Sequence, residues 1–400
     1  MDTSEGAKSG VQMESHVRNI SPGCPDQHHN PVQFPDTESC QENRCHERDN
    51  EMKPTKPSLD EWNELTKFIR NNNLENVRLW FESRGLGSNA KDLWNINSYW
   101  PLQTAAETGC VAILDALLEY GFDASGSFFG DGLVQCASTN GHVGMIRRLS
   151  QLGLPLTSNE DYGFTHLHYA AKSGGDNSRA IQYLKQRGID PNSKNWFGET
   201  ALHVASGEGS IHNVHALIEA GASVNIRTTR GISPLYRALK RDGEVLDHVE
   251  TLLEAGAVSL WTPSKYCEFH AASKVKNLSV ISLLVSMNFY MTGEGCGWED
   301  SPLYNLAMMA NSDREQAIDI TIRGGYDIKP DLAWILDDRH YPAFFEKEAL
   351  RKQLMFYATN PMTLVQMSCV VIRKVLGPSL PATLPSLPLP ERLRDCVRIR

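Results

Sequence analysis

Residues 198–225 read GETALHVASGEGSIHNVHALIEAGASVN. Leu202 opens a short apolar run, the small pair Ala205 and Ser206 follows, and a second apolar run ends at Gly221. Both runs carry apolar residues at helical spacing. Glycine ends a helix in the left-handed conformation because it has no Cβ to clash. The stretch therefore predicts a unit of two helices that closes at a glycine.

The same pattern recurs along the chain at intervals of 32 to 35 residues. An apolar residue opens the first helix of each unit, at Leu102, Val134, Leu167, Leu202, Leu235, Phe269 and Leu303. The second helices end at Gly121, Gly153, Gly188, Gly221 and Gly256, and Asn288 takes the next such place. Units of this kind bury their apolar faces only against their neighbours. The opening positions and the closing positions recur in step with each other, and together they predict seven stacked repeats.

Two segments carry the best-formed motif, THLHYAA at 165–171 and TALHVAS at 200–206. They resemble the ankyrin repeat family, and the resemblance extends from about Trp62 to Asp327. It implies an all-α ankyrin-repeat solenoid with hairpin loops, preceded by a half-repeat cap at 65–86. It also implies a structural hydrogen bond, and no catalytic or metal role, for His168 and His203.

Residues 360–400 read NPMTLVQMSCVVIRKVLGPSLPATLPSLPLPERLRDCVRIR. Asn360 can cap a helix and Gly377 can end it. Between them Leu364, Ser368 and Ile372 recur at i, i+4 and i+8 on an apolar stripe. The segment resembles a SOCS box of three helices, and repeats followed by such a box resemble the ankyrin repeat and SOCS box family. The alternative readings are a last solenoid helix and a disordered proline-rich tail.

That family supplies substrate receptors to cullin–RING ubiquitin ligases. Its elongin-binding pattern falls on Leu364, Ser368 and Ile372, with serine at the place of the family's cysteine. Its cullin-binding pattern falls on Leu387, Pro388, Leu389 and Pro390. The resemblance implies elongin C with elongin B, and cullin five with a RING protein, as partners, and an unknown protein substrate. The chain would promote ubiquitination and degradation of that target.

The composition sets the wider limits. Lys and Arg number 39 against 48 Asp and Glu, a net charge of −9, whereas nucleic-acid-binding proteins are usually basic. Residues 1–57 hold six prolines and one aromatic residue, which predicts disorder. We expect repeats over 58–330, linking helices over 331–358 and the box over 359–400. With no bilayer-length apolar run or signal pattern, and nine cysteines read as reduced thiols, we expect a cytoplasmic or nuclear protein without a membrane partner.

Motifs for catalysis are missing from the sequence: it has no phosphate-binding glycine loop, no HExxH and no nucleophile elbow. We therefore expect a non-catalytic protein without cofactor or metal. A zinc knuckle from Cys24, His28, His29, Cys40, Cys45 and His46 is disfavoured because few apolar residues surround them. The other functions considered are an ankyrin scaffold without a ligase role and an enzyme with an unrecognised site.

Three successive hairpin tips carry aromatic residues where turns usually take polar ones. These residues are Phe128, Phe129, Tyr162, Trp196 and Phe197. The later tips, Thr229-Arg230 and Pro263-Ser264, carry none. An exposed aromatic strip is typical of a binding surface, so we predict that these residues bind the substrate. The alternative is that the rings pack on adjacent hairpins and only stiffen the array.

Overall fold

The computed structural model describes residues 57–86, 99–124, 130–156, 162–258, 267–287, 289, 301–309, 313–336 and 348–360. Contacts divide the chain into Met1–Met52 and Lys53–Arg400, and every described residue belongs to the second unit. The regular structure of these residues is helical. The disorder predicted for 1–57 falls almost wholly outside them, as does the box beyond Asn360.

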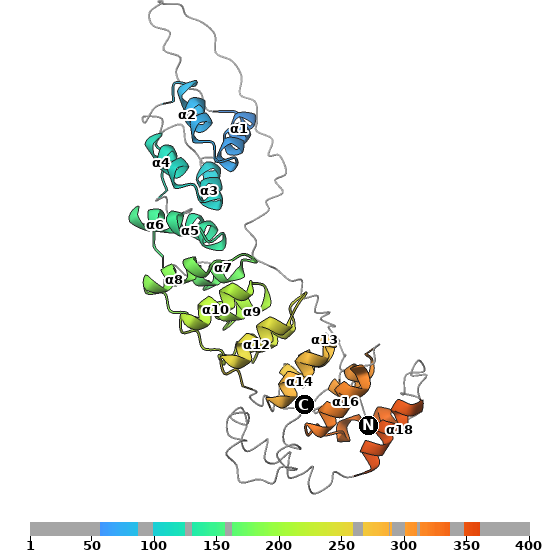
Figure 1. Cartoon of the computed structure of the whole chain (residues 1–400). Helices are drawn as coiled ribbons and strands as arrows, with labels where there is room; N and C mark the ends of the chain where they lie inside the picture. The colour runs from blue at the N-terminus through green and yellow to red at the C-terminus, as the bar shows by residue number, and fades with distance from the viewer. Residues whose placement is uncertain are drawn as a thin grey trace, which may run out of the picture. The chain divides into compact units, whose positions relative to one another are not determined.

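Seven helix pairs occupy the predicted repeats, in chain order from α3 to α16 (Figure 1). They are α3 (Tyr99–Thr108) with α4 (Val111–Glu119), α5 (Gly130–Thr139) with α6 (Val143–Gln151), α7 (His166–Lys172) with α8 (Ser178–Gln186), α9 (Ala201–Gly207) with α10 (Ile211–Glu219), α11 (Pro234–Leu239) with α12 (Leu246–Glu254), α13 (Glu268–Val275) with α14 (Leu278–Ser286), and α15 (Pro302–Ala307) with α16 (Asp313–Arg323). The prediction of seven helix pairs is confirmed.

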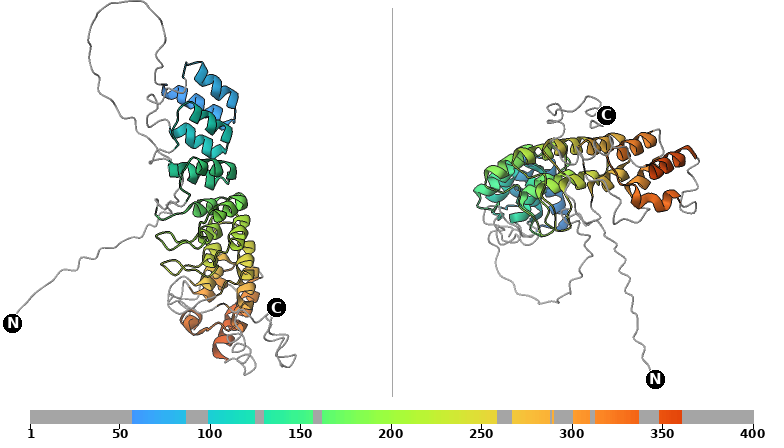
Figure 2. Two further views of the ribbon diagram at one scale, coloured as in Figure 1. Left: turned by 90° about the vertical axis from the view of Figure 1, so that its left-hand side faces the viewer. Right: turned by 90° about the horizontal axis from the view of Figure 1, so that it is seen from below.

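The pairs stack so that first helices pack on first helices and second helices on second helices (Figure 2). All seven residues predicted to open the first helices are buried, none with more than 3% of its surface exposed. Full burial of one such side chain stabilises the fold by about 1.5–3 kcal/mol. The core therefore runs from repeat to repeat between the two layers.

The five predicted closing glycines have φ between +88° and +92°, the left-handed region that glycine adopts without strain. Gly325, with φ +100°, ends α16 in the same way and was not among the predicted positions. Asn288 lies outside the described residues.

The N-terminal cap differs from the predicted half repeat because it is a complete helix pair, α1 (Leu59–Arg70) and α2 (Leu74–Glu82). Ser58 and Glu61 form a capping box that starts α1 six residues before the expected Leu65. Phe81 stacks on Tyr120 of the first repeat, with ring centroids 4.2 Å apart. The cap thus covers the first repeat with aromatic side chains.

Beyond the last repeat come the 3₁₀ turn η4 (Lys329–Asp331), α17 (Leu332–Leu336) and α18 (Glu348–Thr359). The carboxylate of Asp331 is buried and accepts hydrogen bonds from Ser301, Tyr326 at 2.7 Å and Trp334 at 2.8 Å. Burial raises the pKa of this carboxyl. Ser301 also caps α15, so the cluster ties α17 to the last repeat. In the described part of the chain, no helix is long and apolar enough to cross a membrane.

Candidate protein-binding surface

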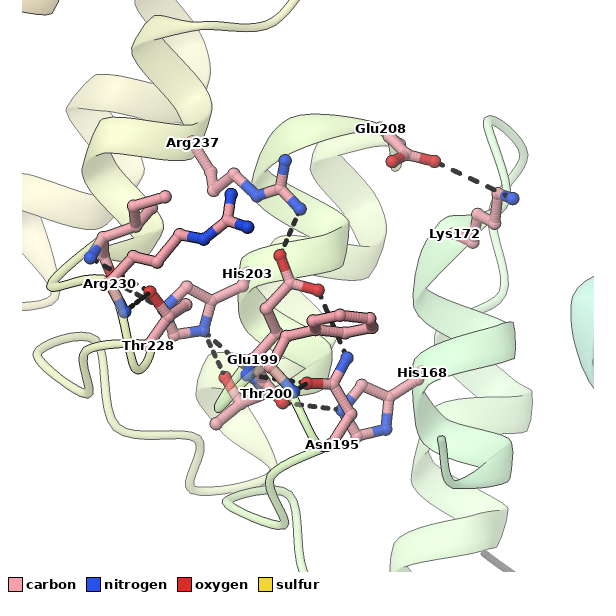
Figure 3. Close-up of polar contacts among 12 residues, drawn as sticks. His168, Lys172, Asn195, Glu199, Thr200, His203, Glu208, Thr228, Arg230 and Arg237 are labelled. Carbon is pink, nitrogen blue, oxygen red and sulfur yellow. Dashed lines mark hydrogen bonds and ion pairs between the residues drawn. The ribbon is translucent and has the colours of Figure 1, made fainter. Parts of the chain in front are cut away.

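His168 and His203 lie in the first turn of α7 and α9 and connect consecutive repeats (Figure 3). The Nδ1 atom of His203 accepts the Thr200 N–H at 3.1 Å, so Nε2 carries the proton and donates to the Ile232 carbonyl at 3.1 Å. His168 repeats this arrangement one unit earlier, with Thr165 and the Glu199 carbonyl. The structural hydrogen bond that the family resemblance implied is confirmed.

Both imidazoles are buried and neutral at pH 7. Burial lowers the pKa of His203 to about 4, and it also lowers the pKa of His168. A proton on Nδ1 would also point at the backbone N–H of Thr200 or Thr165 that this atom accepts, and the hydrogen bond would be lost. These histidines therefore hold hairpins in place and have no accessible lone pair for chemistry or for a metal.

A network of polar side chains fixes the hairpin between α8 and α9 (Figure 3). Asn195 Oδ1 accepts the backbone N–H groups of Phe197 and Glu199 at 3.0 and 2.9 Å. Its Nδ2 donates to Glu199 Oε2 at 3.2 Å, and Arg237 of α11 forms an ion pair with the other carboxylate oxygen. The tip at Trp196 and Phe197 is therefore ordered before any partner arrives, which lowers the entropy cost of binding.

Successive hairpins are joined through their backbones at the tips. The Trp196 N–H donates to the Tyr162 carbonyl at 2.9 Å, and the Thr229 N–H donates to the Phe197 carbonyl at 3.1 Å. A Cβ at Gly198 would lie 2.7 Å from the Thr229 nitrogen, and φ there is +77°. Glycine at this position lets the two hairpins approach.

Three of the five predicted aromatic tip residues lie in the described chain and form one exposed cluster. Tyr162, Trp196 and Phe197 are 58%, 69% and 50% exposed. The Tyr162 ring lies edge-on to Trp196 with centroids 5.5 Å apart and is stacked with Phe197 at 6.3 Å. The rings thus touch across two hairpins, as the alternative reading required, and still leave half or more of their surface open. Phe128 and Phe129 lie outside the described residues.

The predicted box residues also lie outside the described part of the chain. These are Leu364, Ser368, Ile372, Leu387, Pro388, Leu389 and Pro390. Helix α18 ends at Thr359, and four residues separate that end from Leu364. The Cys and His residues at 24–46 fall outside as well; within the described ranges no group of three or more His, Cys, Asp or Glu side chains could hold a metal ion.

Comparison with known families assigns two parts of the chain. The model for ankyrin repeats (3 copies) matches residues 122–195 and 176–260, and the model for the SOCS box matches residues 360–398. The chain is an ankyrin repeat and SOCS box protein. In proteins that carry one, a SOCS box binds elongin and marks the substrate receptor of a cullin–RING ligase, and ankyrin repeats bind other proteins. Proteins with a SOCS box act as ligase adaptors rather than as catalytic subunits.

Individual relatives match only part of this ankyrin repeat and SOCS box protein. The ankyrin repeat protein FPV022 of fowlpox virus is 26% identical over 174 residues, 36% of this chain and 29% of that protein. Alpha-latrotoxin-Lhe1a of Latrodectus hesperus is 34% identical over 87 residues, 21% of this chain and 6% of the toxin. The E3 ubiquitin-protein ligase KEG of Arabidopsis thaliana is 35% identical over 78 residues, 19% of this chain and 5% of the ligase. The chain thus spans less than a third of the length of each of these relatives.

Proposed function

We propose that this protein is the substrate-recognition subunit of an elongin B/C–cullin–RING E3 ubiquitin ligase. The repeats over 58–330 bind a target protein, helices at 331–358 link them to the box, and the box over 359–400 recruits the ligase in the cytoplasm or nucleus. The observation that carries this proposal is the SOCS box match that follows the repeats.

Within the box, Leu364, Ser368 and Ile372 are proposed to contact elongin C, which brings elongin B. The segment 387–390 is proposed to contact cullin five with its RING protein. The receptor itself forms and breaks no bond. It raises the effective concentration of target lysines beside the charged conjugating enzyme, which promotes ubiquitination and then degradation of the target.

The exposed cluster of Tyr162, Trp196 and Phe197 supports a target-binding role for the hairpin tips. Aromatic side chains dominate the energetic centres of protein interfaces. Trp196 and Phe197 lie on the hairpin that the Asn195 and Glu199 network holds in place, and Tyr162 lies on the preceding hairpin. Phe128 and Phe129, which lie outside the described residues, are proposed to belong to the same target-binding surface.

The test is co-purification of elongin C with the full-length chain and with Leu364→Pro. Proline inside the predicted box helix removes a backbone donor and the leading apolar contact, so elongin C should be lost. The matched control is Pro388→Ala with Pro390→Ala, which changes the same box and should retain elongin C. Undiminished recovery of elongin C with Leu364→Pro would refute the ligase function and favour a scaffold without a ligase role.

A further inference from the structure

The second helices of two adjacent repeats carry an unusual concentration of positive charge. Helices α6 (VGMIRRLSQ) and α8 (SRAIQYLKQ) contain no acidic residue, although the chain as a whole has a net charge of −9. The two helices pack against each other. Their cations, with the residue that caps α8, are Arg147, Arg148, Arg179, Lys185 and Arg187.

The ring of Tyr183 brings two of these arginines together. The guanidinium carbon of Arg147 lies 5.6 Å from the ring centroid, and that of Arg187 lies 5.2 Å from it. The two guanidinium carbons are therefore separated by no more than the sum of these two distances. Arg187 also donates through Nε to the Tyr183 hydroxyl at 3.0 Å. Stacking on an aromatic ring restricts each guanidinium and leaves its outer N–H donors available.

Arg179 extends the same surface. Residues 179, 183 and 187 are spaced at i, i+4 and i+8 and share one face of α8. Arg147, Arg179 and Arg187 are all exposed, whereas Tyr183 is buried with 8% of its surface open. We call Arg147, Arg179 and Arg187 the α6–α8 arginine patch.

Two acidic side chains beside these cations already have partners. Asp115 of α4 accepts from Arg148 Nε at 2.7 Å. Asp176 accepts the Ser178 N–H at 3.0 Å, and hydrogen bonds from Ser178, followed by nearby charges that include Arg179, lower the pKa of Asp176. Among the described residues, Arg147 and Arg187 have no acidic partner within ion-pair distance. Their charge is therefore available to a partner from outside.

We propose that the α6–α8 arginine patch binds an acidic segment of a partner protein, with Arg147 and Arg187 each holding one carboxylate. Guanidinium groups bind carboxylates through two parallel hydrogen bonds. In an extended peptide, carboxylates two residues apart are separated by about 7 Å, a spacing within reach of the pair. A nucleic acid or an anionic membrane would present many more phosphates, whereas this patch has only three cations. It lies between α4, which carries Asp115 and Glu119, and α10, which carries Glu219. The proposal is independent of the ligase function, since it involves neither the box nor the hairpin tips.

The test measures binding of a fluorescein-labelled decapeptide of alternating glutamate and serine to the full-length protein by polarisation. Arg147→Gln with Arg187→Gln should weaken binding at least tenfold. The control Lys67→Gln with Arg70→Gln removes the same charge from exposed positions on α1 and should leave affinity unchanged. Arg147→Lys with Arg187→Lys keeps the positive charge but loses the two parallel hydrogen bonds of each guanidinium fork. It should weaken binding by a smaller factor.

Equal binding by the wild type and the glutamine variant would overturn the proposal. So would full affinity in the lysine variant, because the paired forks would then be unnecessary. Parallel measurements use a single-stranded DNA oligonucleotide and phosphatidylserine vesicles; tighter binding of either through the patch would show that the partner class is wrong. Circular dichroism checks folding of each variant. Elongin C recovery should be the same for all of them, so failure here leaves the ligase proposal untouched.

Discussion

His203 makes the stability of the repeats depend on pH, and the size of the effect follows from its surroundings. The pKa of this imidazole is about 4 in the folded chain, because it is buried, against about 6.5 in the unfolded chain. As pH falls below 6.5 the unfolded state takes up the proton first, so stability present at pH 7 is lost. Linkage gives a loss of about 2 kcal/mol from this residue between pH 7 and pH 5.

The perturbation is His203→Gln, followed by urea unfolding monitored by circular dichroism at pH 7 and pH 5. At pH 7 the variant should be less stable by about 1–3 kcal/mol, because the hydrogen bonds to Thr200 and Ile232 are weakened or lost. Its stability should then fall by about 2 kcal/mol less than that of the wild type on going to pH 5.

The control is Val214→Ala, which removes two methyl groups from a fully buried position on α10. It should cost about 2 kcal/mol at both pH values, since no titrating group is lost. If His203→Gln keeps the full pH dependence of the wild type, the imidazole is not a buried neutral group and does not cause the loss of stability at low pH.

Three further predictions concern recruitment and capture. Pro388→Ala with Pro390→Ala should reduce co-purification of the cullin while elongin C is retained; equal loss of both would mean that the two motifs are not separate. Ser368→Cys should leave the affinity for elongin C unchanged or raise it, because a less polar side chain enters a buried contact. A titration that shows a tenfold loss of affinity, ~1.4 kcal/mol, would indicate a specific role for the serine hydroxyl. Trp196→Ser with Phe197→Ser should abolish ubiquitination of the target. The melting temperature should stay near that of the wild type, since both rings are half or more exposed. A clearly lower melting temperature would show that the two rings hold the hairpins together.

The first helix of the N-terminal cap is longer than the apolar pattern of the sequence predicts. The sequence predicts the cap over 65–86, beginning at Leu65. The helix begins at Leu59, because Ser58 and Glu61 satisfy its first backbone N–H groups through a capping box. The Ser-x-x-Glu pattern at 58–61 is a local signal in the sequence, whereas the apolar repeat alone places the start of the helix later.

The candidate surfaces could be anticipated only in part. The sequence predicts the aromatic tips because Tyr162 and Phe197 directly precede the hairpin glycines Gly163 and Gly198, and turn sequences are local. Their exposure and contacts depend on how one hairpin hydrogen-bonds to the next, at Trp196 and Thr229. The α6–α8 arginine patch had a sequence signal, the absence of acidic residues from both helices. No sequence signal indicates that Arg147 and Arg187 contact the same tyrosine ring, because the two residues are 40 positions apart.

The sequence by itself determined the seven helix pairs of the repeats and five of their closing glycines, because helical periodicity and the left-handed preference of glycine act within one repeat. It also carried both box motifs as linear patterns. Only the tertiary structure decided which side chains stay open to a partner. Trp196 and Tyr183 are both aromatic, yet one is 69% exposed and the other 8%. The difference arises because Trp196 stands on a hairpin tip that no element covers in the described chain, whereas Tyr183 lies beneath arginine side chains of its own and the preceding repeat.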